Sequence, residues 1–92
     1  ADEVGIPLSH LAMAFTLAHP GVTSAIIGPR TMEQLESTLA GAEIALSDEV
    51  LDRIDAIVPP GESIGAMDMV YRGPEVGNAA LRRRPVSDRM AG

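Results

Sequence analysis

The stretch that decides the fold is Val22-Thr23-Ser24-Ala25-Ile26-Ile27-Gly28-Pro29-Arg30-Thr31-Met32-Glu33-Gln34. It opens with a short apolar run, residues 22–27, bounded by Pro and Gly on both sides, which predicts a buried strand. The apolar character of the run favours a parallel strand over a half-exposed antiparallel one. A tight turn and a helix start follow, because Thr31 and Gln34 have the spacing of a capping box. This stretch therefore predicts a strand, a turn and a helix in that order.

Upstream of this stretch, the chain shows the apolar spacing i, i+3, i+4, i+7 that is typical of a helix buried along one face. The residues in this pattern are Leu8, Leu11, Ala12 and Phe15. Pro7 suits the first turn of such a helix, because a proline lacks the N–H group that would have no partner there. The helix must end by His19, because the residue before a proline is disfavoured in the helical conformation.

Downstream, two further helices are predicted. The helix capped by Thr31 carries an inward stripe of Met32, Leu35 and Leu39, and Gly41 is expected to stop it. Ser47 is expected to cap the last clear helix, which has acidic residues in its first turn, where the helix dipole favours them. Its buried stripe is predicted at Val50, Leu51, Ile54, Ile57 and Val58, before Pro59-Pro60-Gly61 ends it.

The chain divides at residue 61. Residues 62–92 show weak helical periodicity and are expected to form a long tail of low intrinsic order. In residues 1–61, a single strand cannot form a sheet by itself, because its backbone groups need neighbouring strands. Helices beside one fully apolar strand are typical of an α/β domain, so we expect this chain to be a fragment of a larger one.

Composition excludes several classes of protein. The 92 residues carry a formal charge of −6, with 13 acidic and seven basic residues, which argues against a nucleic-acid binder. The absence of cysteine excludes a disulfide scaffold and a cysteine zinc site. No apolar run approaches the roughly 18–20 residues of a membrane span. Residues 1–4 have no signal-peptide pattern, so we expect a cytoplasmic protein.

The turn at residues 28–31 is the segment that could carry chemistry. A helix N-terminus presents free backbone N–H groups and a positive dipole end, which favours phosphate. Gly28 allows close approach of a ligand to the backbone, and the guanidinium of Arg30 suits phosphate oxygens. The alternative interpretation is an ordinary strand-to-helix turn with a solvated arginine.

Residues 19–36, with the sequence His-Pro-Gly-Val-Thr-Ser-Ala-Ile-Ile-Gly-Pro-Arg-Thr-Met-Glu-Gln-Leu-Glu, resemble the C-terminal cofactor-binding segment of the aldo-keto reductase family. The similarity extends from near Ala1 through the helix at 47–58. It implies that the chain is the C-terminal fragment of a (β/α)8 TIM barrel. Residues 22–27 would be the eighth strand, 31–40 the eighth helix, and 47–58 the family's extra C-terminal helix.

The same resemblance implies an oxidoreductase that reduces aldehydes or ketones with NADPH, to which this chain contributes the adenosine-phosphate end of the cofactor site. Gly28 and Arg30 fall in the turn that meets the 2′-phosphate. Gln34 falls where many members place an arginine on that phosphate. Ser37 and Thr38 fall where the family commonly has Glu-Asn facing the adenine. These departures leave NADH as an alternative cofactor.

No catalytic residue is assigned to this chain. The family's catalytic Asp, Tyr, Lys and His come from the first half of the barrel, and this sequence has no lysine. Tyr71 lies in the tail and matches no part of that set, so we expect the chain alone to be inactive. In the family the tail closes over the substrate pocket, where Met67 and Met69 could contact substrate. No metal-ligand pattern is present around His10 or His19.

A second hypothesis is a non-catalytic short protein that acts as a binding or self-associating module. An unpaired apolar strand favours pairing with another chain, including a second copy. A third hypothesis is a relative of potassium-channel subunits, which share the turn-and-helix pattern but serve regulation. The arginine run at 82–84 is too short to indicate nucleic acid in a chain of this charge.

Overall fold

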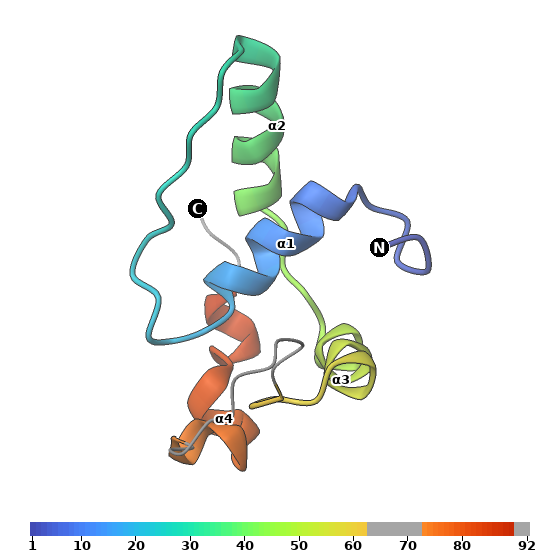
Figure 1. Ribbon diagram of the computed structural model, residues 1–92, viewed down its shortest axis with the longest axis vertical. Coiled ribbons are helices and arrows are strands. Elements are labelled where there is room, and N and C mark those ends of the chain that lie inside the picture. Colours follow the sequence, from blue (N-terminus) through green and yellow to red (C-terminus); the bar gives the residue numbers. More distant parts are fainter. Residues whose placement is uncertain (63–72, 90–92) are drawn as a thin grey trace.

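Three helices and a C-terminal group of short helical segments make up the structure, a computed structural model that describes residues 1–62 and 73–89 (Figure 1). The longer helices are α1 (Leu8–Leu17), α2 (Met32–Ala42) and α3 (Asp48–Ile57). The short segments are η1 (Pro74–Val76), α4 (Ala79–Arg82) and η2 (Val86–Asp88). Helices α1 and α2 pack against each other, and α2 lies at the opposite end of the molecule from α4.

The three longer helices are those that the sequence predicts, and two of them begin at the predicted caps. The Thr31 hydroxyl oxygen accepts a hydrogen bond from the backbone N–H of Gln34 at 3.1 Å. The Ser47 hydroxyl oxygen accepts one from the backbone N–H of Val50 at 3.3 Å. Both caps satisfy backbone donors of the first turn, which have no partner inside the helix.

Gly41 does not stop α2, contrary to the prediction. The helix continues to Ala42, and Gly41 is buried inside its last turn. A Cβ atom at this position would lie 3.0 Å from the Cα of His10 and 3.3 Å from the Cβ of Met13. The glycine therefore serves close packing of α2 on α1 rather than termination of the helix.

The predicted strand at residues 22–27 is absent from the described part of the chain, which contains only helices and loops. These residues belong to the long loop that joins α1 to α2 along one side of the molecule (Figure 1). The physical reason is the one raised by the sequence: a single strand has no neighbour for its backbone groups. Ile26, which a sheet would cover, is fully exposed at 101%.

The apolar core is small and lies where α1, α3 and the connection between α2 and α3 meet. Its buried members are Ala14, Ala18, Leu46 and Leu51. The predicted stripes of α1 and α2 are largely uncovered: Leu8 is 72% exposed, Phe15 47%, Met32 68% and Leu39 54%. On α3, Leu51 is buried and Val50 and Ile54 are partly buried, whereas Ile57 and Val58 are exposed.

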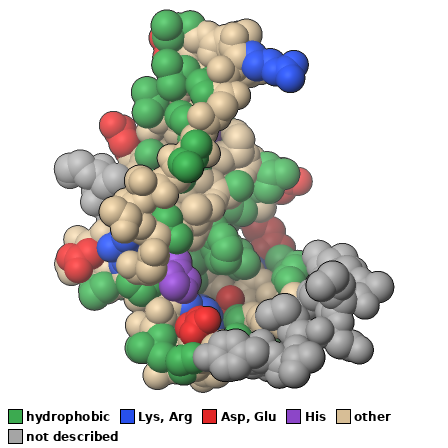
Figure 2. All heavy atoms as spheres, turned by 60° about the vertical axis from the view of Figure 1, so that its left-hand side comes forward, with side chains coloured by type: hydrophobic (Ala, Val, Ile, Leu, Met, Phe, Trp, Pro, Cys, Tyr) green, Lys and Arg blue, Asp and Glu red, His purple; other side chains and the backbone are tan. Residues whose placement is uncertain are grey.

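Much apolar surface is therefore left uncovered, as the hydrophobic side chains spread over the face in Figure 2 show. The accessible surface is 6766 Å² for a chain of 9.6 kDa. A compact monomer of this mass exposes about 5,100 Å². Among the described residues, Leu8, Ile26, Met32 and Ile57 are large hydrophobic side chains that contribute to this exposed area.

Candidate functional site

The start of α2 is built from Arg30, Thr31 and Gln34, in the region where the sequence predicts a phosphate site. Besides the Thr31 cap, the side-chain oxygen of Gln34 accepts a hydrogen bond from the backbone N–H of Arg30 at 2.8 Å. In the usual capping box this bond goes to the cap residue itself, so here Gln34 reaches one residue further back. Gln34 thus holds the Arg30 backbone in place, and its amide carries no charge for a phosphate.

Gly28 and Arg30 are both exposed on the loop that leads into α2. A Cβ atom added at Gly28 would meet nothing within 4 Å, so the backbone there is open to an approaching ligand. The first-turn N–H groups of α2 give this end a positive dipole that favours an anion near Arg30. The carboxylate of Glu33, also in the first turn and exposed, opposes that attraction.

Ser37 and Thr38 are half-buried, and both hydroxyls make internal hydrogen bonds. The Ser37 hydroxyl lies 3.0 Å from Nε2 of His10 and links α2 to α1. The Thr38 hydroxyl donates to the backbone oxygen of Gln34 at 2.9 Å. The structure therefore brings Arg30 and Gln34 together at the helix start but turns Ser37 toward α1. The link to His10 was not predicted, since the two residues are 27 positions apart and no local pattern pairs them.

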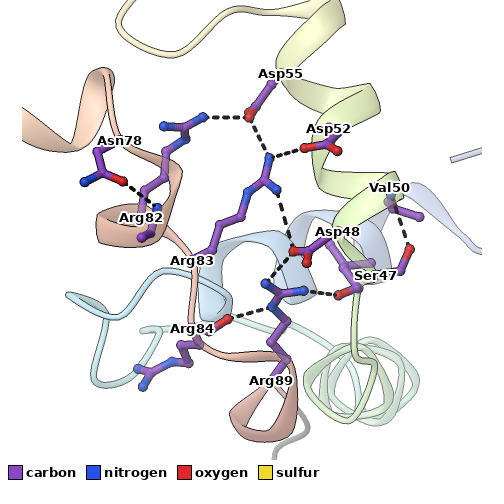
Figure 3. Close-up of polar contacts among 12 residues, drawn as sticks. Ser47, Asp48, Val50, Asp52, Asp55, Asn78, Arg82, Arg83, Arg84 and Arg89 are labelled. Carbon is purple, nitrogen blue, oxygen red and sulfur yellow. Dashed lines mark hydrogen bonds and ion pairs between the residues drawn. The ribbon is translucent and has the colours of Figure 1, made fainter.

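A cluster of arginines and aspartates joins α3 to residues 82–89, and it too was missed by the sequence interpretation (Figure 3). Arg83 is its centre: one nitrogen, Nη2, lies 2.7 Å from Asp55 Oδ2 and 2.9 Å from Asp52 Oδ1. Arg82 also bonds Asp55 Oδ2, at 2.8 Å. Arg89, whose side chain is 4% exposed, bonds Asp48 Oδ1 at 2.7 Å. The sequence did contain a signal for this cluster, because the spacings of four and three between Asp48, Asp52 and Asp55 place these residues on one face of α3.

Burial and pairing act against each other on the charges of this cluster. Burial alone would raise the pKa of the Asp55 carboxyl, but hydrogen bonds from Arg82 and Arg83 outweigh it and hold that pKa below its ordinary value. Burial alone would lower the pKa of Arg83, and its bonds to Asp52 and Asp55 raise it instead. The Asp55 carboxylate and the Arg83 guanidinium thus stay ionised and paired, so this pair supplies structure rather than an acid or a base.

A cavity of about 550 Å³ lies beside this cluster, between α1, α3 and residues 82–83. Its apolar wall includes Phe15, Leu51 and Ile54, and its polar wall includes Asp55 and Arg82. None of the five predicted cofactor residues lines it. The cavity and the start of α2 are therefore separate features of the described structure.

Three further points concern metal binding, membrane-spanning helices and the residues named for the tail. Among the described residues, no group of three or more His, Asp or Glu side chains is arranged to hold a metal ion. In the same residues, no helix has the length and apolar character needed to span a membrane. Met67, Met69 and Tyr71, named above for the tail, lie outside the described residues.

Comparison with known proteins gives a consistent result over the first two-thirds of the chain. The profile of the Aldo/keto reductase family matches residues 1–59. The "Uncharacterized oxidoreductase YrpG" of Bacillus subtilis is 45% identical over 60 residues, which is 64% of this chain and 18% of that protein. "Protein tas" of Escherichia coli is 34% identical over 57 residues, 62% of this chain and 16% of that protein.

A "Probable voltage-gated potassium channel subunit beta" of Arabidopsis thaliana is 32% identical over 60 residues, 63% of this chain and 18% of that protein. The chain thus spans less than one-fifth of the length of the curated relatives it matches. No solved structure matches it significantly. The matched part includes α1, α2 and α3 but not the segment at 73–89.

Proposed function

This chain belongs to the aldo/keto reductase family, and we propose that it is the C-terminal part of an NADPH-dependent reductase that converts aldehydes or ketones to alcohols. In this proposal the chain supplies the adenosine-phosphate end of the cofactor site within a (β/α)8 barrel. The catalytic groups lie in the part of the protein that this chain does not contain, so the chain alone has no turnover. The intact protein would work in the cytoplasm, where the nicotinamide cofactor is supplied.

The exposed Arg30 at the start of α2 carries the proposal. Arg30 immediately precedes Thr31, the residue that caps α2, and its backbone N–H is held by the side chain of Gln34. A cationic fork beside free backbone donors is suited to a phosphate group. The open backbone at Gly28 would allow the nucleotide to approach closely.

The same residues suggest how the adenine would be bound. Ser37 and Thr38 would lie along the adenine, but their hydroxyls are already engaged with His10 and with the Gln34 carbonyl. They would therefore contribute packing rather than base-specific hydrogen bonds. With Gln34 neutral, Arg30 would be the single cation that favours NADPH over NADH, and NADH remains the alternative cofactor.

The uncovered apolar surface supports the view that the chain is part of a larger barrel. A parallel strand at residues 22–27 would cover Ile26 and pair its backbone groups, and the exposed faces of Leu8, Phe15 and Leu39 would gain partners. At about 25 cal/mol per Å² of apolar area, this burial would favour association with the remaining barrel strongly.

The first experiment is to measure the intact mass of the native gene product and then its cofactor preference. In a product several times heavier than 9.6 kDa, we expect Arg30→Ala to raise the Km for NADPH about tenfold, since a charge-assisted bond to phosphate is lost. The Km for NADH should change little, because NADH has no 2′-phosphate. Glu36→Ala, at an exposed position on α2, is the control. Equal effects of Arg30→Ala on both cofactors would contradict the assignment.

The second candidate function is a self-associating module, which the full exposure of Ile26 favours if the native product is 9.6 kDa. An exposed extended segment with apolar side chains offers a template for a second chain. Sedimentation of the 92-residue chain would then show a concentration-dependent dimer that Ile26→Lys disrupts. A monomer at every concentration would exclude this function. A role as a channel subunit, the third hypothesis, would require a partner protein.

A further inference from the structure

The C-terminal end of α1 is bonded to a residue far along the chain. The last turn of α1 has no basic residue, so the carbonyl groups at this end need donors from outside the helix. Nε of Arg84 donates to the Leu17 carbonyl at 3.0 Å, and the Arg84 backbone N–H donates to the Ala18 carbonyl at 2.6 Å. Nη2 of the same side chain donates to the carbonyl of Val22, which follows the turn after α1. The negative end of the helix dipole also favours a cation here.

The segment that carries Arg84 is also bonded to the start of α3. Nε of Arg89 donates to the Arg84 carbonyl at 2.8 Å. The terminal nitrogens of Arg89 bond the Leu46 carbonyl at 3.2 Å and Asp48 at 2.7 Å (Figure 3). The Arg89 side chain is 4% exposed, so these bonds are shielded from water. Residues 82–89 therefore join the end of α1 to α3.

This junction and the candidate cofactor site lie at opposite ends of one loop. Helices α1 and α2 run in the same general direction, downward in Figure 1, and the loop at 18–31 rises from the lower end of α1 to the start of α2. Arg84 is bonded at the lower end of this loop, through the carbonyl of Val22. Arg30 stands at the upper end, directly before the Thr31 cap of α2.

The proposed barrel gives these two ends different roles. In it, residues 22–27 would form a strand that begins at the end where Arg84 binds and finishes beside Gly28 and Arg30. Active sites of (β/α)8 barrels lie at the face where the strands finish, and the opposite face contributes stability. We propose that residues 82–89 are a clamp on this opposite face: they fasten the end of α1 to α3 and leave the cofactor site uncovered. This inference rests on the proposed function, and the clamp lies outside the part that matches the family profile.

The clamp is compatible with a paired strand at residues 22–27. The bond from Arg84 reaches the first residue of that strand, so the residues between Val22 and Gly28 can pair with neighbouring strands. Their pairing would hold this segment whether or not Arg84 is present. Loss of the clamp should therefore loosen residues 79–89 and the end of α1 without moving Arg30.

The test measures amide exchange and the Kd for NADPH in the native gene product. In Arg84→Gln we expect exchange in residues 79–89 and in the last turn of α1 to be about tenfold faster, because the charged fork that spans two carbonyls is lost. The Kd for NADPH should stay within about twofold. Arg53→Gln is the control: Arg53 is also ion-paired, with Glu3, but both side chains are exposed, so exchange in residues 79–89 should not change.

Two results would overturn the clamp. One is unchanged exchange in residues 79–89 of Arg84→Gln, and the other is a Kd for NADPH that rises about tenfold in that variant. Arg84→Lys keeps the cation but lacks the planar fork, so it should give a smaller increase in exchange. If Arg84→Gln does not fold, the same two criteria apply to Arg84→Lys.

Arg30→Ala separates failure of the clamp from failure of the proposed function. This variant should raise the Kd for NADPH about tenfold and leave exchange in residues 79–89 unchanged. If Arg30→Ala has no effect on NADPH binding, the proposed function fails, and the bond between α1 and α3 is judged by exchange in Arg84→Gln. If Arg30→Ala weakens binding but Arg84→Gln does not speed exchange, the clamp alone fails.

Discussion

The region formed by α1, α2 and the loop between them differs from the region formed by α3 and residues 73–89 in how its contacts are made. In the first, α1 and α2 are joined by close packing at Gly41 and by a side-chain hydrogen bond between His10 and Ser37. In the second, Arg82, Arg83 and Arg89 pair with three aspartates of α3 at distances down to 2.7 Å.

The difference lies in the charged groups, because apolar side chains are exposed in both regions, Ile57 and Val86 among them in the second. In the second region the arginine side chains and Asp55 are paired at low exposure, as buried charges must be, whereas their partners Asp48 and Asp52 are exposed. In the first region, the apolar side chains of Leu8, Ile26 and Met32 remain open to solvent. The family match covers all of the first region but only the α3 half of the second, so the tightest polar contacts join a matched helix to an unmatched segment.

A pair of leucine substitutions gives the largest expected contrast. Leu51→Ala on α3 should destabilise the 92-residue chain by about 3 kcal/mol, because Leu51 is 3% exposed and its removal opens a cavity in a small core. Leu39→Ala on α2, where the side chain is 54% exposed, should cost less than about 0.5 kcal/mol. Urea unfolding followed by circular dichroism measures both changes in unfolding free energy. Equal changes in the two variants would contradict the expected difference between the two regions.

The pH dependence of stability should come mainly from the second region. Asp55 has a lowered pKa in the folded chain, so its contribution is present above the ordinary Asp value of about 4 and is lost as pH falls through the lower folded value. Asp55→Asn should remove about 2 kcal/mol at neutral pH and flatten the acid limb of the stability curve. Glu36→Gln on the exposed face of α2 is the control and should leave that curve unchanged. An unaltered acid limb in Asp55→Asn would show that the cluster is not the origin of the dependence.

The two helix caps give the smallest contrast. Thr31→Ala and Ser47→Ala each remove a side-chain acceptor from a first turn and should each cost about 1 kcal/mol. The loss at Ser47 should appear in global unfolding, because α3 carries Leu51 of the core. The loss at Thr31 should appear mainly as faster amide exchange in the first turn of α2. Identical exchange patterns in the two variants would indicate that α2 is as firmly packed as α3.

Local signals predicted the helices but not what covers them. The hydroxyls of Thr31 and Ser47 each bond a backbone N–H three residues later, so the local sequence is enough to predict both caps. Gly41 was misinterpreted because the same residue type ends helices and permits close packing, and only the position of α1 distinguishes the two. The predicted strand at 22–27 is wrong for the described residues, because pairing needs neighbouring strands and residues 1–62 and 73–89 contain none.

At the candidate site, the sequence alone determined which residues stand in the turn before α2 and that Thr31 caps it, since these follow from spacing along one segment. Only the tertiary structure decided that Ser37 is joined to His10 and that Asp48, Asp52 and Asp55 face the arginines. The tertiary structure also decided that the Arg84 side chain donates a hydrogen bond to the Leu17 carbonyl at the end of α1. These contacts join residues 27 to 67 positions apart. Such pairings depend on how helices pack, which no local pattern specifies.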